Sequence, residues 1–275
     1  MAIKLIVFDV DGTVVDEDHY TVPEENAAAL KEARSRGIKL AIASGRTWSI
    51  LTEVAEQVGG VDYAIMSNGA AILDVNTGER LFEKGIPPAQ SLAVMEVLDR
   101  EDLPYEMYCG GQNYVALEVK DRLRDGLLSP AFGDMFVKRM TVVPDLREAL
   151  NGRDMEKINL FYAPVEARAR IREALLKTGP LEISNALEGN MEFTYGGVCK
   201  GTTLEHLARC LGISVDEVMA FGDAGNDVEM LRWAGWSFAM ENGSEAAKAA
   251  ARAIAPPNYL GGVGRTVRKY VLEQE

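Results

Sequence analysis

Four short segments combine acidic, hydroxyl, amide or ammonium groups with glycine. They are Asp9-Val10-Asp11-Gly12-Thr13, Ser44-Gly45-Arg46, Lys200-Gly201 and Gly222-Asp223-Ala224-Gly225-Asn226-Asp227. If the segments meet, four carboxylates (those of Asp9, Asp11, Asp223 and Asp227) repel one another unless a cation lies among them. Oxygen ligands of this kind select a hard cation, and Mg²⁺ is the one that most often also contacts a substrate phosphate.

Lys200, Ser44 and Gly45 add groups that favour a bound phosphate. An ammonium at the start of a helix opposes the helix dipole, and a nearby anion such as phosphate would compensate for it. The Ser44 hydroxyl and the Gly45 amide, at a turn from strand to helix, can hold phosphate oxygens. A metal, a lysine, a hydroxyl and an amide together indicate phosphoryl transfer.

Each segment alone also has a simpler interpretation. Asp-x-Asp-Gly is common in turns, Asn226 could cap the helix after it, and Ser44-Gly45 could be an ordinary loop. A calcium loop does not fit, because its glycine stands at the sixth position rather than the fourth. It is the combination of segments that favours a phosphate site.

The elements between these segments predict a parallel sheet that brings them together. Lys4–Asp9, Lys39–Ala43 and Tyr63–Met66 are apolar runs typical of strands buried on both faces. Helical patterns separate them, so the pairing should be parallel with right-handed crossovers. The carboxyl ends of such strands share one edge of the sheet, where ligands bind.

The pattern changes after a hairpin predicted over 70–82. Residues 83–188 indicate a separate α+β unit, and the parallel pattern resumes towards the C-terminus. We therefore expect a doubly wound, Rossmann-like α/β core over 1–82 and 189–275, with a cap domain inserted over 83–188. Two connections at one hinge would let the cap close over the core.

Composition excludes several classes of protein. The 275 residues include 47% hydrophobic and 26% charged side chains, which is typical of a globular protein and not of a disordered chain. The formal net charge of -13 disfavours nucleic acid or an anionic membrane as a partner, and it leaves the oligomeric state open. Three cysteines at no metal-ligand spacing suit reduced thiols in the cytoplasm, and no segment approaches 18 apolar residues.

The four segments resemble the four motifs of the haloacid dehalogenase-like superfamily: DVDGT, the serine of IASGR, the lysine of CKG, and GDAGND. The position of the insertion resembles subclass IIB, the Cof-type phosphatases with an α/β cap. The similarity extends over essentially the whole chain and is weakest in the cap.

The resemblance implies a role for each motif residue. Asp9 would be the nucleophile that forms an aspartyl-phosphate and a ligand of Mg²⁺, and Asp11 the acid and base, with its backbone carbonyl also on the metal. Asp223 would ligate Mg²⁺ directly, and Asp227 would orient a metal-bound water. The remaining motif residues would hold the phosphoryl group: Val10 and Gly45 through their amides, Ser44, Lys200 and Asn226.

Three further residues are left between two interpretations. Arg46 could touch substrate or support its loop, and Asn68 could line the cleft or turn the chain into the hairpin. His19 lies in the segment after Asp11, but a surface histidine is the more common case. In the cap, Tyr105, Tyr108 and Tyr114 could contact a sugar or a nucleotide, but aromatic side chains in strands usually pack.

The sequence predicts a Mg²⁺-dependent phosphatase for small organophosphates, with phosphosugars as the expected class and a small phosphorylated metabolite as the partner. A sugar phosphomutase of the same fold would return the phosphoryl group to the sugar instead of to water. A regulatory phospho-acceptor module would keep the aspartyl-phosphate. Asp11, which can activate water, and the large cap both disfavour that third interpretation.

Overall fold

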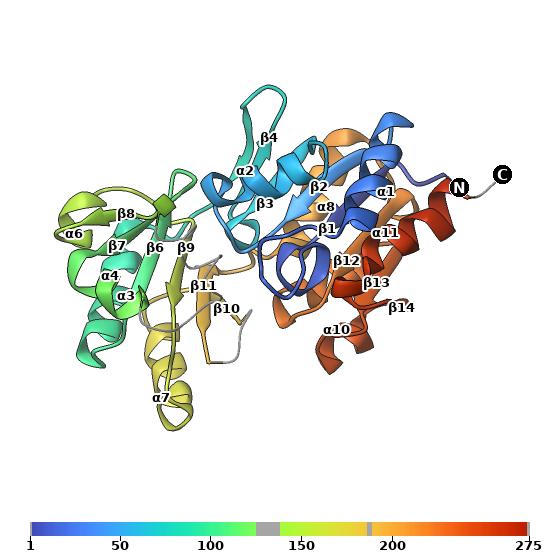
Figure 1. Ribbon diagram of the computed structural model, residues 1–275. Coiled ribbons are helices and arrows are strands. Elements are labelled where there is room, and N and C mark those ends of the chain that lie inside the picture. Colours follow the sequence, from blue (N-terminus) through green and yellow to red (C-terminus); the bar gives the residue numbers. More distant parts are fainter. Residues whose placement is uncertain (1, 125–137, 186–188, 274–275) are drawn as a thin grey trace.

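The computed structural model describes residues 2–124, 138–185 and 189–273. They form two sheets in two units that lie side by side (Figure 1). We call the unit with the eight-stranded sheet the core and the unit with the six-stranded sheet the cap. Both chain ends lie at the side of the core that is away from the cap (Figure 1).

The core sheet has the strand order β14-β13-β12-β1-β2-β3-β4-β5. Its strands are β1 (Leu5–Phe8), β2 (Lys39–Ala43), β3 (Tyr63–Met66), β4 (Ala71–Asp74), β5 (Arg80–Glu83), β12 (Val218–Gly222), β13 (Trp236–Met240) and β14 (Ala253–Ala255). The six strands from β14 to β3 are parallel, and β4 and β5 add an antiparallel hairpin at one edge. The predicted doubly wound fold is confirmed.

Helices cover both faces of the core sheet. They are α1 (Glu24–Ser35), α2 (Trp48–Gln57), α8 (Lys200–Leu211), α9 (Val228–Trp233), α10 (Glu245–Ala250) and α11 (Gly262–Val267). Ile6 and Phe8 of β1 pack in a cluster with α1, α2 and α11, whereas Leu5 and Val7 pack in another with α8 and α9. This two-sided burial explains why β1 is an unbroken apolar run.

The cap sheet has the order β10-β11-β9-β6-β7-β8. Its strands are β6 (Tyr105–Cys109), β7 (Gln112–Ala116), β8 (Thr141–Val143), β9 (Lys157–Leu160), β10 (Leu181–Ser184) and β11 (Met191–Tyr195), and its helices are α3 (Pro88–Arg100), α4 (Leu117–Arg124), α6 (Leu146–Ala149) and α7 (Val165–Leu176). Met107, Ile158 and Phe193 pack against α3 and α7. Alternate positions carry polar side chains that are nevertheless buried, among them those of Lys157 and Glu192.

The predicted return to the core at residue 189 is wrong. β11 (Met191–Tyr195) pairs antiparallel with both β9 and β10, so it belongs to the cap sheet. Met191 and Phe193 also pack in the apolar cluster of the cap. The cap sheet therefore extends to Tyr195, and the core resumes with α8.

The cap packs against α2 of the core. Ile50 of α2 shares a small apolar cluster with Val115, Val119 and Met140 of the cap. Arg139 of the cap also donates hydrogen bonds to the Ser49 carbonyl and to the Glu53 carboxylate. The two chain connections run beside each other, because the Lys84 ammonium lies 4.8 Å from the centre of the Tyr195 ring.

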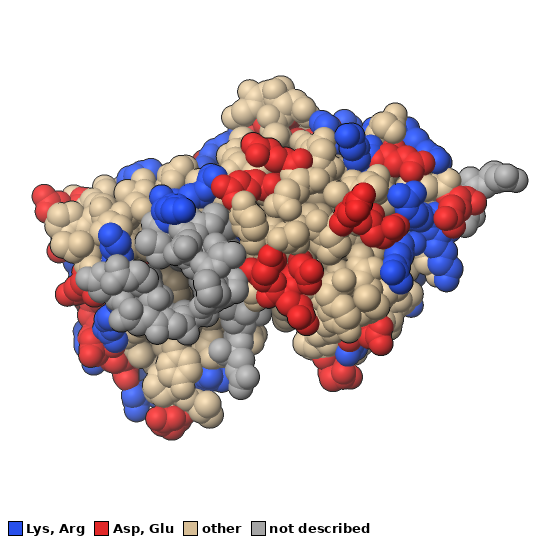
Figure 2. Space-filling model, in the orientation of Figure 1, with Lys and Arg blue, Asp and Glu red and all other residues tan. Residues whose placement is uncertain are grey.

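The surface reflects the acidic composition. On the face that Figure 2 shows, groups of Asp and Glu side chains lie on the core near its junction with the cap, whereas Lys and Arg side chains of the core lie mainly towards the side away from the cap. Among the described residues, no helix combines the length and the apolar character that crossing a membrane requires.

Candidate active site

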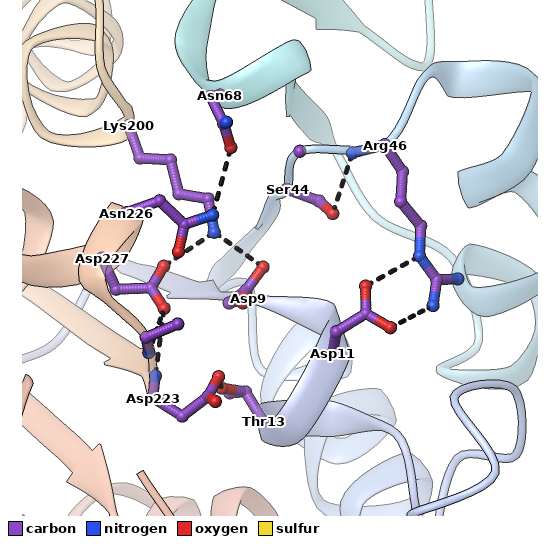
Figure 3. A network of polar contacts seen from close by, with 12 residues as sticks. Asp9, Asp11, Thr13, Ser44, Arg46, Asn68, Lys200, Asp223, Asn226 and Asp227 are labelled. Atoms are coloured by element: carbon purple, nitrogen blue, oxygen red, sulfur yellow. Dashed lines mark hydrogen bonds and ion pairs between the residues drawn. The ribbon is translucent and has the colours of Figure 1, made fainter. Parts of the chain in front are cut away.

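Three neighbouring strands of the core deliver the acidic and hydroxyl groups to one edge of the sheet. Asp9 follows β1, Ser44 follows β2, and Asp223 follows β12. Lys200, the first residue of α8, points into the same space (Figure 3). These strand ends lie side by side because the strand order is β12-β1-β2. The predicted convergence of four carboxylates is present for Asp9, Asp223 and Asp227 only, because the Asp11 carboxylate pairs with Arg46 instead.

A buried ammonium lies between two carboxylates. The Lys200 Nζ is 2.8 Å from the Asp9 Oδ1 and 2.7 Å from the Asp227 Oδ1, and all three side chains are buried. Burial lowers the pKa of Lys200, but the charges of Asp227 and Asp9 outweigh it and raise that pKa overall. Burial and then the charge of Asp227 raise the pKa of Asp9 well above 3.8, although Lys200 opposes the shift.

Asp9, Asp223 and Asp227 form an acidic cluster. One carboxylate oxygen of each lies within 4.8 Å of the others. The Thr13 hydroxyl donates to the Asp223 Oδ1 over 2.9 Å, and the amides of Asp223 and Ala224 donate to the Asp227 Oδ2 over 3.0 and 3.1 Å. Burial and the charge of Asp227 raise the pKa of Asp223 to about 7.

Gly12 is required where the first segment passes the acidic cluster. Its φ of 70° lies in the left-handed region that favours glycine. A β-carbon at Gly12 would also lie 2.4 Å from the Asp223 Oδ2. The glycine of the Asp-x-Asp-Gly segment therefore lets the backbone pass directly beside the Asp223 carboxylate.

The Asp11 carboxylate points away from the acidic cluster towards Arg46 (Figure 3). The Arg46 Nε donates to the Asp11 Oδ2 over 2.9 Å, and the Arg46 Nη2 donates to the Asp11 Oδ1 over 2.5 Å. The His19 Nδ1 lies 3.0 Å from the same Oδ1. Burial alone would raise the pKa of Asp11, but the Arg46 charge and these hydrogen bonds lower it well below its usual range.

Arg46 and His19 were not assigned to Asp11 from the sequence. The two interpretations left for Arg46 were substrate contact and loop support, and the structure places its guanidinium on Asp11. His19 was expected at the surface, and its side chain is 30% exposed, but its ring also contacts Asp11, which the sequence did not indicate. The position of Arg46 could have predicted its contact with Asp11, because Arg46 follows β2, Asp11 follows β1, and these two strands are neighbours in the sheet. His19 offers no such pattern.

The candidate phosphate-binding groups surround Asp9. Ser44 is buried, and its Oγ accepts a hydrogen bond from the Arg46 amide over 3.2 Å. Val10 follows Asp9 directly, and Gly45 follows Ser44. The Asn226 Nδ2 donates to the Asn68 Oδ1 over 3.2 Å. This contact agrees with the interpretation that Asn68 lines the cleft.

Comparisons with known proteins find similar phosphatases over most of the chain. The chain is 28% identical over 270 residues to a 5-amino-6-(5-phospho-D-ribitylamino)uracil phosphatase of Bacillus subtilis, covering 98% of this chain and 96% of that protein. It is 30% identical over 241 residues to an HMP-PP phosphatase of Cronobacter sakazakii, covering 87% of this chain and 84% of that protein.

Solved structures match over almost the entire chain. A haloacid dehalogenase-like hydrolase from B. subtilis superposes with a TM-score of 0.87 at 25% identity, covering 98% of this chain and all of that one. A sugar phosphatase described as HAD subclass IIB superposes with a TM-score of 0.82 at 25% identity, covering 97% and 98%. The family model for haloacid dehalogenase-like hydrolases matches residues 6–267, and the chain belongs to that family.

Proposed function

We propose that this chain, a phosphatase of the haloacid dehalogenase-like family, hydrolyses small organophosphates in the cytoplasm with Mg²⁺, and that phosphosugars are its main class of substrate. One observation carries the proposal. Asp9 lies between the Lys200 ammonium and the carboxylates of Asp223 and Asp227, at the strand ends where a phosphate would bind. A nucleophile, a fixed positive charge and a cation site therefore occupy one small space.

In the proposed reaction, an Asp9 oxygen attacks phosphorus. The bond between phosphorus and the leaving oxygen breaks, and that oxygen takes a proton from Asp11. Water then attacks phosphorus and gives a proton to Asp11, the bond to Asp9 breaks, and free phosphate leaves. Lys200 would balance the charge of Asp9 and of the phosphoryl oxygens. Four groups would orient the phosphoryl oxygens: the amides of Val10 and Gly45, and the side chains of Ser44 and Asn226.

Asp11 has to change its environment during this cycle. Arg46 and His19 hold its carboxylate in the ionised form, which suits the second step, in which Asp11 accepts a proton. To donate a proton in the first step, Asp11 must be protonated when substrate is bound. We therefore propose that substrate binding weakens the contact between Arg46 and Asp11.

The residues present fit a divalent cation. Three carboxylates and one ammonium (Asp9, Asp223, Asp227 and Lys200) carry two net negative charges when all are ionised, which one Mg²⁺ would neutralise. Burial and then the charge of Asp227 raise the pKa of Asp223, and a bound cation would offset both effects by favouring the ionised carboxylate. Asp9, Asp223 and the Asp11 carbonyl would hold the ion, with Asp227 acting through a water. When bound, Mg²⁺ would withdraw charge from the phosphoryl group.

The cap supports the proposed size of the substrate. Its sheet places a buried polar face against the core, so a macromolecular ester would not fit beneath the docked cap. The two relatives described above have names that specify small phosphorylated compounds, and one structural neighbour is described as a sugar phosphatase. These three similarities support a small phosphorylated metabolite as the partner.

The test is phosphate release from a panel of phosphosugars, nucleotides and other small phosphoesters, with Mg²⁺ and with EDTA. We expect one group of esters to be hydrolysed with Mg²⁺ only, and the Asp9→Asn variant to fold normally without turnover. More than trace activity in Asp9→Asn would contradict the scheme. An isomerised sugar phosphate as product would indicate a mutase, and a phospho-enzyme that lasts minutes without turnover would indicate a phospho-acceptor module.

A further inference from the structure

An ion pair of the cap contacts the segment Ser44-Gly45-Arg46 of the core, which we call the phosphate loop. The Lys157 Nζ on β9 is 2.5 Å from the Glu192 Oε1 on β11, and it donates a hydrogen bond to the Gly45 carbonyl over 2.6 Å. Both side chains are buried. A buried ion pair adds little net stability, but its geometry is strict and losing one partner is costly. This pair therefore fixes where the cap docks.

Asn68 connects this ion pair to Asn226. Its Nδ2 donates to the Glu192 Oε2 over 2.8 Å, and its Oδ1 accepts from the Asn226 Nδ2 over 3.2 Å. In Figure 3 the Asn68 side chain points directly at Asn226. The backbone at Asn68 has a φ of 57°, a region that residues other than glycine seldom occupy and that tends to mark functional sites.

Gly45 shows how closely these groups pack. A β-carbon there would lie 3.0 Å from the Asn68 Oδ1, 3.2 Å from the Lys157 Nζ and 3.3 Å from the Glu192 Oε1. The backbone of Gly45 is not in the left-handed region, so the need for glycine comes from these neighbouring side chains. The phosphate loop, Asn68 and the docked cap therefore form one packed unit.

The direction of these hydrogen bonds determines which atom of the Asn226 amide faces a bound phosphate. An asparagine amide can present either its oxygen or its nitrogen, whereas an ionised carboxylate only accepts. Glu192 therefore requires the Nδ2 of Asn68, which turns the Oδ1 of Asn68 towards Asn226. Asn226 must then present its Nδ2, which keeps a second N–H for a phosphoryl oxygen. A reversed Asn226 would offer an oxygen to an anion.

We propose that Asn68 is a positioning residue, which sets the orientation of the Asn226 amide when Glu192 of the cap is docked. The proposal rests on the proposed function, since Asn226 matters here as a ligand of the phosphoryl group. It goes further in making phosphate affinity depend on a cap residue. With the cap undocked, Asn68 loses Glu192 and the Asn226 amide loses its fixed direction.

The test exchanges the donor and acceptor between two positions. Asn68→Asp alone places two carboxylates against each other, and Glu192→Gln alone places two amide donors against each other while Lys157 holds the other oxygen. In the double variant Asn68→Asp/Glu192→Gln, the new glutamine donates to the new aspartate, which still accepts from Asn226. The double variant also has the net charge of the wild type.

The readouts are the dissociation constant of inorganic phosphate, by calorimetry on the Mg²⁺-loaded full chain, and kcat/KM on the best ester of the panel. We expect each single variant to weaken phosphate binding and kcat/KM by about tenfold to a hundredfold, as for a lost hydrogen bond to a charged group. The double variant should return to within about fivefold of the wild type, because the direction at Asn226 is restored.

Ser67→Gly is the matched control. Ser67 has a φ of 51° and donates to Glu156 of the cap over 2.9 Å, so this variant also removes a contact between core and cap beside Asn68. Phosphate affinity in Ser67→Gly should stay within about threefold of the wild type, because the Ser67 hydroxyl donates to Glu156 and not to the Asn68–Asn226 pair. Asn68→Gly keeps the backbone conformation and should weaken phosphate binding as the single variants do.

Three results would overturn the proposal. Single variants within about threefold of the wild type would show that Asn226 needs no partner. A double variant as weak as the singles would show that the direction of the bonds does not matter. A wild type that neither binds phosphate nor hydrolyses any ester would refute the proposed function, and the role of Asn68 with it. The first two results leave the phosphatase intact, so the two failures are distinguishable.

Discussion

Asp223 links the acidic cluster to the stability of the fold. Burial and the charge of Asp227 raise its pKa from 3.8 to about 7 in the folded protein, against the opposing hydrogen bond from Thr13. Between these two values, the folded protein binds a proton that the unfolded chain has already released. The contribution to the free energy of unfolding is therefore complete below about pH 4 and is lost as the pH rises through about 7.

The size of this loss follows from the shift. About 3 pKa units at about 1.4 kcal/mol per unit correspond to about 4 kcal/mol over the whole window. About 2.5 kcal/mol of this falls between pH 5 and pH 8, because the unfolded carboxyl is already ionised at pH 5. Since Asp223 is partly exposed to solvent, which screens its charge, we expect a measured loss of about 2 kcal/mol.

The assay is urea unfolding of the metal-free wild type and of Asp223→Asn from pH 5 to pH 8. The variant is neutral at every pH, so the difference between the two proteins isolates this carboxyl. We expect Asp223→Asn to gain about 2 kcal/mol on the wild type across that range. Millimolar Mg²⁺ should reverse the loss in the wild type only. A difference that stays within about 0.5 kcal/mol at every pH would refute the reasoning.

Three other substitutions test separate parts of the site. Lys200→Met leaves two buried carboxylates without their cation and should reduce the free energy of unfolding by about 3–5 kcal/mol in urea; an unchanged midpoint would contradict the burial described. Arg46→Gln removes the charge that lowers the pKa of Asp11, so the acidic limb of the pH profile of kcat should move to higher pH; a fixed limb would show that Asp11 does not set it. Gly12→Ala should weaken Mg²⁺ binding more than about tenfold in a titration, because the new β-carbon displaces the Asp223 carboxylate. Gly78→Ala is the control: Gly78 has a similar φ but open space around it, so this variant should lose only about 1–2 kcal/mol of stability. Equal Mg²⁺ affinity in the two glycine variants would refute the displacement.

The core sheet could be predicted from the sequence because its strands are buried on both faces. Such a strand appears as an unbroken apolar run, and the predicted bounds of Lys39–Ala43 and Tyr63–Met66 are those of β2 and β3. The rule that parallel strands share one carboxyl edge then brings Asp9, Ser44 and Asp223 together without further information. The roles given to these residues remain proposals.

The cap boundary could not be predicted in the same way. The alternating sequence of β11 (Met191–Tyr195) suits a strand in either sheet, and only its pairing with β9 and β10 decides. β8 and β14 have three residues each, which is too short for a periodic pattern. Local sequence predicts whether a segment is a helix or a strand better than it predicts which neighbouring strand that segment pairs with.

The polar contacts missed from the sequence all depend on packing between distant segments. Lys157 and Glu192 have the charges of surface residues, yet both are buried because the polar face of the cap lies against the core. Arg46 reaches Asp11, and Asn68 reaches Glu192, only through the docking of separate elements. A sequence pattern gives the periodicity along one helix or strand, so it does not predict side-chain contacts between separate elements.

The place of β1 in the sheet has a consequence for biosynthesis. Leu5 pairs with Lys39 on one side and with Val218 on the other, so one neighbour of β1 is made early and the other only after the whole cap. The cap strands all lie between Tyr105 and Tyr195 and need no later residue for their sheet. During translation we therefore expect a finished cap attached to an unfinished core, with one apolar strand edge of β1 open until β12 leaves the ribosome. That edge is where a chaperone would act, and where aggregation of a truncated chain would begin.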